Sequence, residues 1–252
     1  MITYKTAAEM EKMRRAGLVV YEALQRVREA VAPGKTTWDL EEVADRAIQE
    51  SGAVSAFRGY RGYPCVLCTS VNEQVVHGIP SRKRVLEAGD IVSVDCGVVL
   101  DGYYGDSATT VAVGGREALP EAVRKLLDVT ESSLLEAIEH ARVGNHLGDV
   151  SSAVQKIAEG AGFGVVREFV GHGIGTHLHE DPQVPNYGRP GTGPKLREGM
   201  VLAIEPMINE RGPAVKVLAD GWTAVTVDGG RSAHFEHTVA ITANGPWVLT
   251  RP

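Results

Sequence analysis

Two segments of the chain repeat each other at a spacing of 110 residues. Leu86–Asp95 (LEAGDIVSVD) aligns without a gap to Leu196–Glu205 (LREGMVLAIE), and both segments end on an acid. At the same spacing Gly34–Gly52 lies over Gly144–Gly162, and both stretches have helical patterning. Chance likeness of two units, each a helix, a glycine and a buried strand, is the alternative. We expect instead a duplicated half-domain, in which two equivalent strands each present one carboxylate to a shared site.

Carboxylates interrupt four apolar, strand-like runs of the chain. They are Asp95 in IVSVDCGVVL, Asp106 in GYYGDSATTV, Glu205 in VLAIEPMI and Glu236 in AHFEHTVAIT. An isolated carboxylate is so costly to bury that it normally neutralises, pairs or binds a metal. None of the runs contains Lys or Arg as a local partner. Carboxylates with an occasional imidazole are ligands for divalent metals, so the sequence predicts one or two bound cations.

The order of elements is predicted to be helix, helix, sheet, and then the same again. The capping box Thr6-x-x-Glu9 predicts a first helix that runs to about Val31. The other predicted helices are Thr37–Ser51, Pro120–Arg142 and Leu147–Glu159, and the predicted strands are 65–70, 91–100, 103–113, 165–170, 200–208, 222–227 and 234–243. No linker interrupts them, so we expect one catalytic domain, 1–252, with pseudo-repeat halves of approximately 1–115 and 116–252.

The spacing of the first two aspartates predicts their relative placement. Asp101-Gly102 is a strong two-residue hairpin signal, and such a turn pairs Gly97 with Asp106. Asp95 lies two residues from Gly97, so both aspartates should point to the same face of the sheet as diagonal neighbours. Two carboxylates at this distance repel unless they share cations. A pair of turn aspartates at the edge of a sheet is the alternative.

Composition narrows the class of protein. The chain has 252 residues and a net charge of −6, which gives no support to a DNA-binding function. The basic run Arg82–Arg84 is expected to be a solvated loop, with contact to an RNA-rich partner as the alternative.

The N-terminus has no signal-peptide core and no segment approaches the roughly 20 apolar residues of a membrane span, so a cytoplasmic protein without a membrane partner is expected. Three cysteines fit a reducing compartment, and Cys65-x-x-Cys68 is interpreted as entry into a strand rather than a redox or zinc motif.

The histidines divide into candidates for chemistry and structural residues. His172 lies in GHGIG, where flanking glycines let the backbone bend and a ligand approach. His77 lies in VVHGIP. In THLHEDP, His177 and His179 alternate, so only one would face a site if the segment were a strand. His140 and His146, in or beside helices, are expected to be structural.

These residues occur in an ordered set of motifs that resembles a known family. The motifs are NEQVVHGIP at 72–80, Val94-Asp95, DGYYGD at 101–106, GHGIG at 171–175, HEDP at 179–182, IEPM at 204–207 and FEHT at 235–238. Together they resemble type I methionine aminopeptidases over nearly the whole chain. The resemblance implies an α+β "pita-bread" fold, with two pseudo-symmetric α/β halves around a dinuclear metal site. It also implies a hydrolase that removes the N-terminal methionine of nascent proteins when the second residue is small.

Carried over to this sequence, the resemblance implies the metal ligands and catalytic groups. Asp106 and Glu236 would bridge two divalent ions, Asp95 would hold one, and His172 with Glu205 would hold the other. A metal-bridging hydroxide would attack the first peptide bond after Glu205 takes the proton of the water. The two remaining groups would contact substrate: His179 would stabilise the oxyanion and His77 would contact the scissile amide nitrogen. The ligand set admits Co, Mn, Fe or Zn.

The resemblance also implies an apolar pocket for the methionine side chain. The matching positions are Tyr60, Tyr63, Cys68 and Trp222, while Leu178 stands where an aromatic residue is common. Expected partners are N-terminal methionyl peptides and nascent chains, with a transient ribosome contact made by a monomeric catalytic domain.

Xaa-Pro aminopeptidases, prolidases and creatinase share the fold, but usually carry a separate N-terminal domain. Type II methionine aminopeptidases carry a long insertion, for which there is little room between His179 and Glu205. Non-catalytic binding proteins of this fold would be expected to lose ligands.

Overall fold

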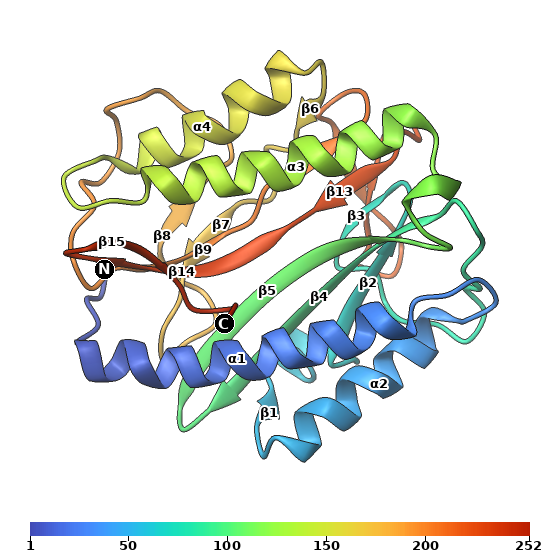
Figure 1. Ribbon diagram of the computed structural model, residues 1–252, viewed down its shortest axis with the longest axis horizontal. Helices are drawn as coiled ribbons and strands as arrows, with labels where there is room; N and C mark the ends of the chain where they lie inside the picture. The colour runs from blue at the N-terminus through green and yellow to red at the C-terminus, as the bar shows by residue number, and fades with distance from the viewer.

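Two pairs of helices cover one face of a large antiparallel sheet in the computed structural model, which describes residues 1–252 (Figure 1). The helices are α1 (Ala7–Ala30), α2 (Thr37–Glu50), α3 (Glu121–His140) and α4 (Leu147–Gly160), with short 3-10 turns at Tyr60–Gly62 and Arg116–Ala118. Each α-helix begins and ends within two residues of its prediction. Capping boxes begin α1 and α2, because the side chains of Thr6 and Thr36 accept from the N–H groups of Glu9 and Asp39. The four predicted helices are therefore confirmed.

The main sheet joins strands from both parts of the chain in the order β1-β4-β5-β14-β9-β7-β8, with β2 paired to β4 and β15 paired to β14. Its strands are β1 (Val54–Ser55), β2 (Leu67–Val71), β4 (Ile91–Leu100), β5 (Tyr103–Ala112), β7 (Gly171–Gly173), β8 (Glu180–Val184), β9 (Val201–Ile204), β14 (Glu236–Thr242) and β15 (Gly245–Val248). Two small sheets flank it. They are β13 (Ser232–His234), β10 (Met207–Asn209) and β6 (Gly164–Val165), and β11 (Val215–Val217), β12 (Ala224–Thr226) and β3 (Gln74–Val76).

Several strand predictions need correction. The predicted strand 165–170 is wrong, because the strand there is only Gly164–Val165 and the next strand begins at Gly171. The predicted strands 200–208 and 234–243 are each two strands that belong to different sheets. Pro206 has no N–H to donate and stands where the first of them breaks. Both breaks lie beside a predicted metal ligand, Glu205 or Glu236.

The internal repeat extends to individual backbone hydrogen bonds. Gly34 N–H donates to Leu86 O at 2.8 Å, and Gly144 N–H donates to Leu196 O at 3.1 Å. Both donors and both acceptors are 110 residues apart. The bridge between Thr36 and Val85 likewise recurs between His146 and Lys195. The two helix pairs are thus joined to the strands that follow them through the same local hydrogen bonds. The division into halves near residue 115 stays a prediction.

The hydrophobic core lies between the helices and the sheet. On β4, Val92, Val94, Cys96 and Val98 are buried in one cluster with residues of α1 and α2. On β9, Leu202 and Ile204 are buried in a second cluster with residues of α3 and α4. Side chains alternate along a strand, so Asp95 and Glu205 must point away from the helices. The fold therefore directs both acids of the repeat to the opposite face of the sheet.

Candidate metal centre and active site

One cavity on the face opposite the helices collects every site residue that the sequence predicted. Its lining contains the predicted metal ligands Asp95, Asp106, His172, Glu205 and Glu236, the predicted catalytic histidines His77 and His179, and the predicted pocket residues Tyr60, Tyr63, Cys68, Leu178 and Trp222. These residues come from segments that are widely separated in sequence. The structure thus brings all of them to one cavity, and their individual roles stay predictions.

The hairpin between β4 and β5 supplies the first two carboxylates. The turn residues Asp101 and Gly102 have φ of 51° and 80°, which a tight two-residue hairpin turn requires. Gly97 pairs with Asp106, as predicted, so Asp95 and Asp106 are diagonal neighbours on one face. One oxygen of each carboxyl, Oδ1, is buried without any hydrogen-bond partner. Two acids with orphaned oxygens on one face are the arrangement that a shared cation would satisfy.

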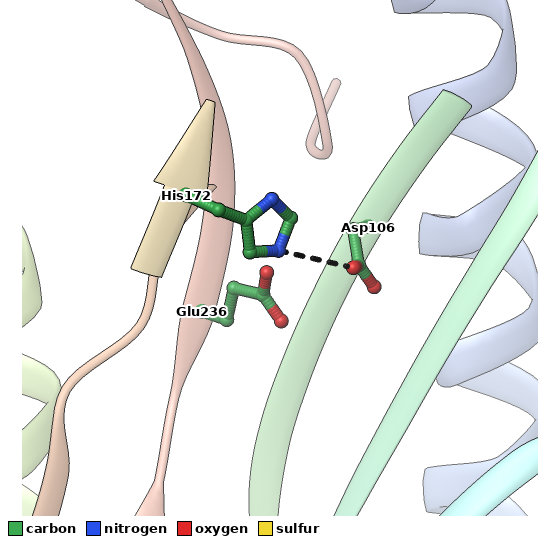
Figure 2. A group of neighbouring side chains, drawn as sticks. All are labelled: Asp106, His172 and Glu236. Carbon is green, nitrogen blue, oxygen red and sulfur yellow. Dashed lines mark ion pairs between the residues drawn. The ribbon is translucent and has the colours of Figure 1, made fainter. Parts of the chain in front are cut away.

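Three buried side chains from different strands form the centre of the cluster. Asp106 on β5, His172 on β7 and Glu236 on β14 point toward one another (Figure 2), and each offers a ligand atom within 4.8 Å of the others. Oε1 of Glu236 is a third buried oxygen without a partner. Gly171 lets β7 approach closely, since a Cβ there would lie 2.3 Å from the carbonyl oxygen of Ala203. The glycines that flank His172 thus serve packing as well as bending.

The hydrogen bond of His172 fixes which ring nitrogen can bind a metal. Nδ1 lies 2.9 Å from the carbonyl oxygen of Gly173, which can only accept, so Nδ1 carries the proton. Nε2 therefore turns a lone pair toward Asp106 Oδ2 at 3.8 Å and Glu205 Oε1 at 3.6 Å. Burial lowers the pKa of His172 to about 3, which keeps the ring neutral. A lone pair facing carboxylate oxygens is repulsive until a cation stands between them, so these residues fit a metal.

Glu205 reaches the cluster from the point where β9 leaves the sheet. Its carbonyl oxygen accepts a hydrogen bond of 2.9 Å from the side-chain amide of Asn186. Burial raises the pKa of Glu205 well above its ordinary value, and the charge of Asp106 raises it further. Burial also raises the pKa of Asp106 and Glu236, and that of Asp95 to about 7. Bound dications would favour the ionised forms instead, and metal binding should therefore compete with protons.

The remaining two candidate histidines border the cluster without belonging to it. His179 packs against His172 with 4.3 Å between ring centroids, and its Nδ1 lies 2.8 Å from the hydroxyl of Tyr60. His77 has a positive φ of 60° and packs edge-on against Phe169. The segment with His177 and His179 forms bends rather than a strand, and His177 is exposed. Only His179 of this pair lines the cavity.

An apolar wall lies beside the predicted ligands. Tyr63 and Trp222 meet edge to face at 5.0 Å between ring centroids. The Tyr63 hydroxyl is bonded to the carbonyl oxygens of Leu67 and Gly78, which leaves its ring as an apolar surface. Cys68 pairs with Asp95 across β2 and β4 and is buried, as is Leu178. The Cys65-x-x-Cys68 segment enters strand β2 as predicted, and its cysteines are free.

Three residues near the site were not predicted from the sequence. Phe57 and Arg61 also line the cavity. His234 is buried, has no partner for Nε2, and lies with that nitrogen 3.7 Å from Oε2 of Glu205. Phe57 and Arg61 lie in a loop without periodic patterning, and His234 lies only two residues from Glu236. The one available signal was that His234 lies inside the apolar run AHFEHTVAIT that carries Glu236, and a single histidine in such a run is a weak signal.

Comparison with known proteins agrees with the geometry of the metal cluster. Metallopeptidase family M24 matches residues 11–243, which is most of the chain. The chain belongs to metallopeptidase family M24. Within this family it is 52% identical over 250 residues to the methionine aminopeptidase of Clostridium acetobutylicum, with 99% of each chain covered. It is 50% identical over 251 residues to methionine aminopeptidase 1 of Bacillus subtilis, with 100% of each chain covered.

Solved structures of the family give the fold. The crystal structure of methionine aminopeptidase from Thermotoga maritima has a TM-score of 0.97 and 52% identity, and all of both chains is covered. The prolidase from Pyrococcus furiosus has a TM-score of 0.78 and 25% identity, and this chain spans 65% of its length. The predicted α+β pita-bread fold is therefore confirmed. No helix of the protein is long and apolar enough to cross a membrane.

Proposed function

We propose that this M24 peptidase is a methionyl aminopeptidase, which removes the N-terminal methionine of peptides when the second residue is small. The observation that carries the proposal is the convergence of three orphaned carboxylate oxygens and an unprotonated imidazole nitrogen on one cavity. Full-length likeness to methionine aminopeptidases from several bacteria supports the same activity.

Two divalent cations are the cofactor that we propose for this site. Asp106 and Glu236 would contact both ions, Asp95 would hold one, and His172 with Glu205 would hold the other. Bound cations of this kind acidify a water molecule and polarise a peptide carbonyl. The donor set of four carboxylates and one imidazole admits Co, Mn, Fe or Zn.

The side chains of this protein then supply proton transfer and orientation. Glu205 would accept the proton of the attacking water, since its carboxylate lines the cavity with Oε1 3.6 Å from His172 Nε2. If the Tyr60 hydroxyl donates to Nδ1 of His179, the Nε2–H of that ring is left to donate to the developing oxyanion. We assign His77 to the scissile amide nitrogen, because its ring lines the cavity and packing against Phe169 fixes its orientation.

Substrate choice would depend on the two sides of the cavity. Tyr63, Cys68, Leu178 and Trp222 form a wall that suits a methionine thioether, with Tyr60 at its margin. Steric exclusion by the loops around His77 and His172 would reject a large second residue. Because nascent chains carry their initiator methionine where they are synthesised, we propose a monomer that acts in the cytoplasm and meets them during a transient ribosome contact.

A peptide panel tests the proposed activity against that of the prolidases, which share the fold. Metal-loaded protein should release methionine from Met-Ala-Ser, Met-Gly-Ser and Met-Ser-Ser, and turn over Met-Leu-Ser and Met-Lys-Ser far more slowly. Proline-containing dipeptides should not be cleaved. Faster cleavage of the dipeptides would favour a prolidase, and equal turnover of all the methionyl peptides would contradict the narrow pocket.

A further inference from the structure

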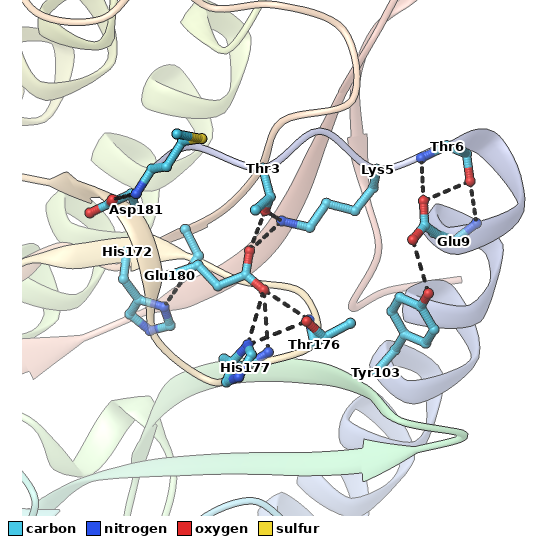
Figure 3. Close-up of polar contacts among 12 residues, drawn as sticks. Thr3, Lys5, Thr6, Glu9, Tyr103, His172, Thr176, His177, Glu180 and Asp181 are labelled. Atoms are coloured by element: carbon cyan, nitrogen blue, oxygen red, sulfur yellow. Dashed lines mark hydrogen bonds and ion pairs between the residues drawn. The ribbon is translucent and has the colours of Figure 1, made fainter.

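A buried ion pair ties the N-terminal segment to the loop that carries His179. Lys5 Nζ lies 2.6 Å from Glu180 Oε2, and the two side chains are only 6% and 8% exposed. Thr3 completes the group, because its hydroxyl accepts from Lys5 and donates to the same Glu180 oxygen. Figure 3 shows Thr3 and Lys5 pointing at Glu180 from one side. An exposed ion pair would carry little energy, but a buried and fully hydrogen-bonded one holds its partners in place.

The other oxygen of Glu180 holds the loop itself. Glu180 Oε1 accepts hydrogen bonds from the backbone N–H groups of Thr176 and His177, at 2.9 and 3.2 Å. These bonds to Thr176 and His177 (Figure 3) close the turn Gly175–Glu180. The same turn contains Leu178 and His179, which line the cavity. Burial alone would raise the pKa of Glu180, yet the bonds from Lys5 and Thr3 hold it below its ordinary value. The Glu180 carboxylate therefore stays charged, and it accepts from Lys5 and Thr3 on one oxygen and from the Thr176 and His177 N–H groups on the other.

Glycine permits this packing and the backbone reinforces it. A Cβ at Gly175 would lie 2.3 Å from Lys5 Cε and 2.6 Å from Glu180 Oε1, so any other residue would push the pair apart. The carbonyl oxygen of Gly175 accepts from the N–H of Tyr104, two residues before Asp106 on β5. The N–H of Lys5 donates to Gly199 O at 2.7 Å, just before β9. The turn is thus tied to both strands that lead to predicted ligands.

We propose that Lys5, Thr3 and Glu180 form a positioning network that fixes His179 over the reacting carbonyl, so that the N-terminal segment controls the rate of peptide cleavage. The inference rests on the proposed role of His179. Lys5 and Glu180 do not line the cavity, so they would act only by holding the turn. Displacing a group by about 1 Å can cost about 100-fold in rate even when the change lies away from the chemistry.

A double-mutant cycle tests whether the network acts through His179. Lys5→Met should lower kcat on Met-Ala-Ser by up to about 100-fold with little change in KM and with unchanged metal binding by calorimetry. In a His179→Ala background the same substitution should cause almost no further loss, because the positioned group is gone. Arg26→Gln, which breaks an exposed ion pair between Arg26 on α1 and Glu50 on α2, is the control and should retain wild-type kcat. An equal loss in both backgrounds, or no loss in either, would overturn the inference.

A milder pair of variants covers the case in which Lys5→Met does not fold. Thr3 is exposed, so Thr3→Val keeps its shape and removes only the hydroxyl, whereas Thr3→Ser retains it. Thr3→Val should lower kcat and speed hydrogen exchange at the Thr176 and His177 amides, and Thr3→Ser should do neither. Identical kcat and exchange in the two variants would contradict the network. Wild-type kcat in His179→Ala would instead refute the proposed role of His179, and this inference with it.

Discussion

The two helix pairs have the same hydrogen bonds at their connections, but the strands that follow them end differently. After Gly89, β4 continues through Asp95 into the tight hairpin with β5. Asp95 and Asp106, the two acids of this hairpin, both lie within the sheet. After the equivalent Gly199, β9 stops at Ile204, and Glu205-Pro206 turns out of the sheet. The first half thus supplies two aspartates from one hairpin, and the second supplies its predicted ligands from separate strands. The comparison indicates that the repeat keeps the scaffold but places its two equivalent acids differently, which is consistent with the different roles that we propose for them.

The largest expected effects are losses of metal occupancy and kcat, and they should differ between an acid of the first half, Asp106, and one of the second, Glu205. Asp106→Asn removes a charge that both ions would share, so it should lower metal occupancy as well as activity. Glu205→Gln should mainly remove the proton acceptor, with a loss in kcat on the order of 10² to 10⁴ and more metal retained. Calorimetric metal titration and kcat measurement on both variants check this difference. Equal metal occupancy and equal activity in the two variants would contradict different roles for Asp106 and Glu205.

Core substitutions at equivalent repeat positions should have smaller effects, on stability. Leu40 on α2 and Val150 on α4 are 110 residues apart, and both are buried. Leu40→Ala should cost about 2 to 5 kcal/mol in free energy of unfolding. Val150→Ala removes less volume and should cost roughly 1.5 kcal/mol from lost burial. Urea denaturation of the metal-free protein gives both values, and a larger loss at Val150 would contradict equivalent packing of the two helix pairs.

The helix caps provide a finer comparison. Thr36 caps α2 with its hydroxyl, which accepts from the N–H of Asp39 at 3.2 Å. At the equivalent position His146 contributes backbone groups: its N–H donates to Asp149 Oδ2 at 2.7 Å, and its carbonyl oxygen accepts from the Asp149 N–H at 2.9 Å. Thr36→Ala should therefore destabilise the protein by about 1 kcal/mol. His146→Ala should cost less than about 0.5 kcal/mol, and the same denaturation experiment would contradict this account if the order were reversed.

The smallest effect is the pH dependence of these caps. Backbone N–H groups at the two caps lower the pKa of Asp39 and Asp149 below their ordinary value. A carboxyl with a lowered pKa in the folded state adds stability at neutral pH, and this is lost as pH falls below about 4 and through the folded pKa. Asp39→Asn and Asp149→Asn should each reduce the loss of stability on acidification. Unchanged acid denaturation curves for both variants would contradict the cap assignment.

Local signals explain why part of the fold could be predicted from the sequence. The Thr6 capping box, the helix-ending glycines and the Asp101-Gly102 turn each act over a few residues, so they determine helix ends and hairpin register without knowledge of the rest of the fold. The apolar runs around the acids predicted burial for the same reason. Assigning roles to His77 and His179 required the resemblance to a family, because a histidine in a loop has no local partner that identifies its function.

Long-range contacts explain what the sequence did not predict. The 165–170 segment is apolar enough for a strand, but its pairing with β10 ends after Val165 and a single further bond from Val166 N–H to Met207 O. The strand breaks near Glu205 and Glu236 occur where the chain passes from one sheet to another. Lys5 and Glu180 are 175 residues apart in the chain. No pattern within either segment specifies that pairing, which forms only after both halves are folded.

Removal and return of the metal is the most direct test of the central claim, that acids from both halves form one cation site required for peptide cleavage. Protein treated with a chelator and verified as metal-free should not release methionine from Met-Ala-Ser, and addition of Mn or Co should restore the activity. Metal affinity should also decrease as pH falls, because protons compete for the same carboxylates. Full activity in a verified metal-free sample would contradict the account.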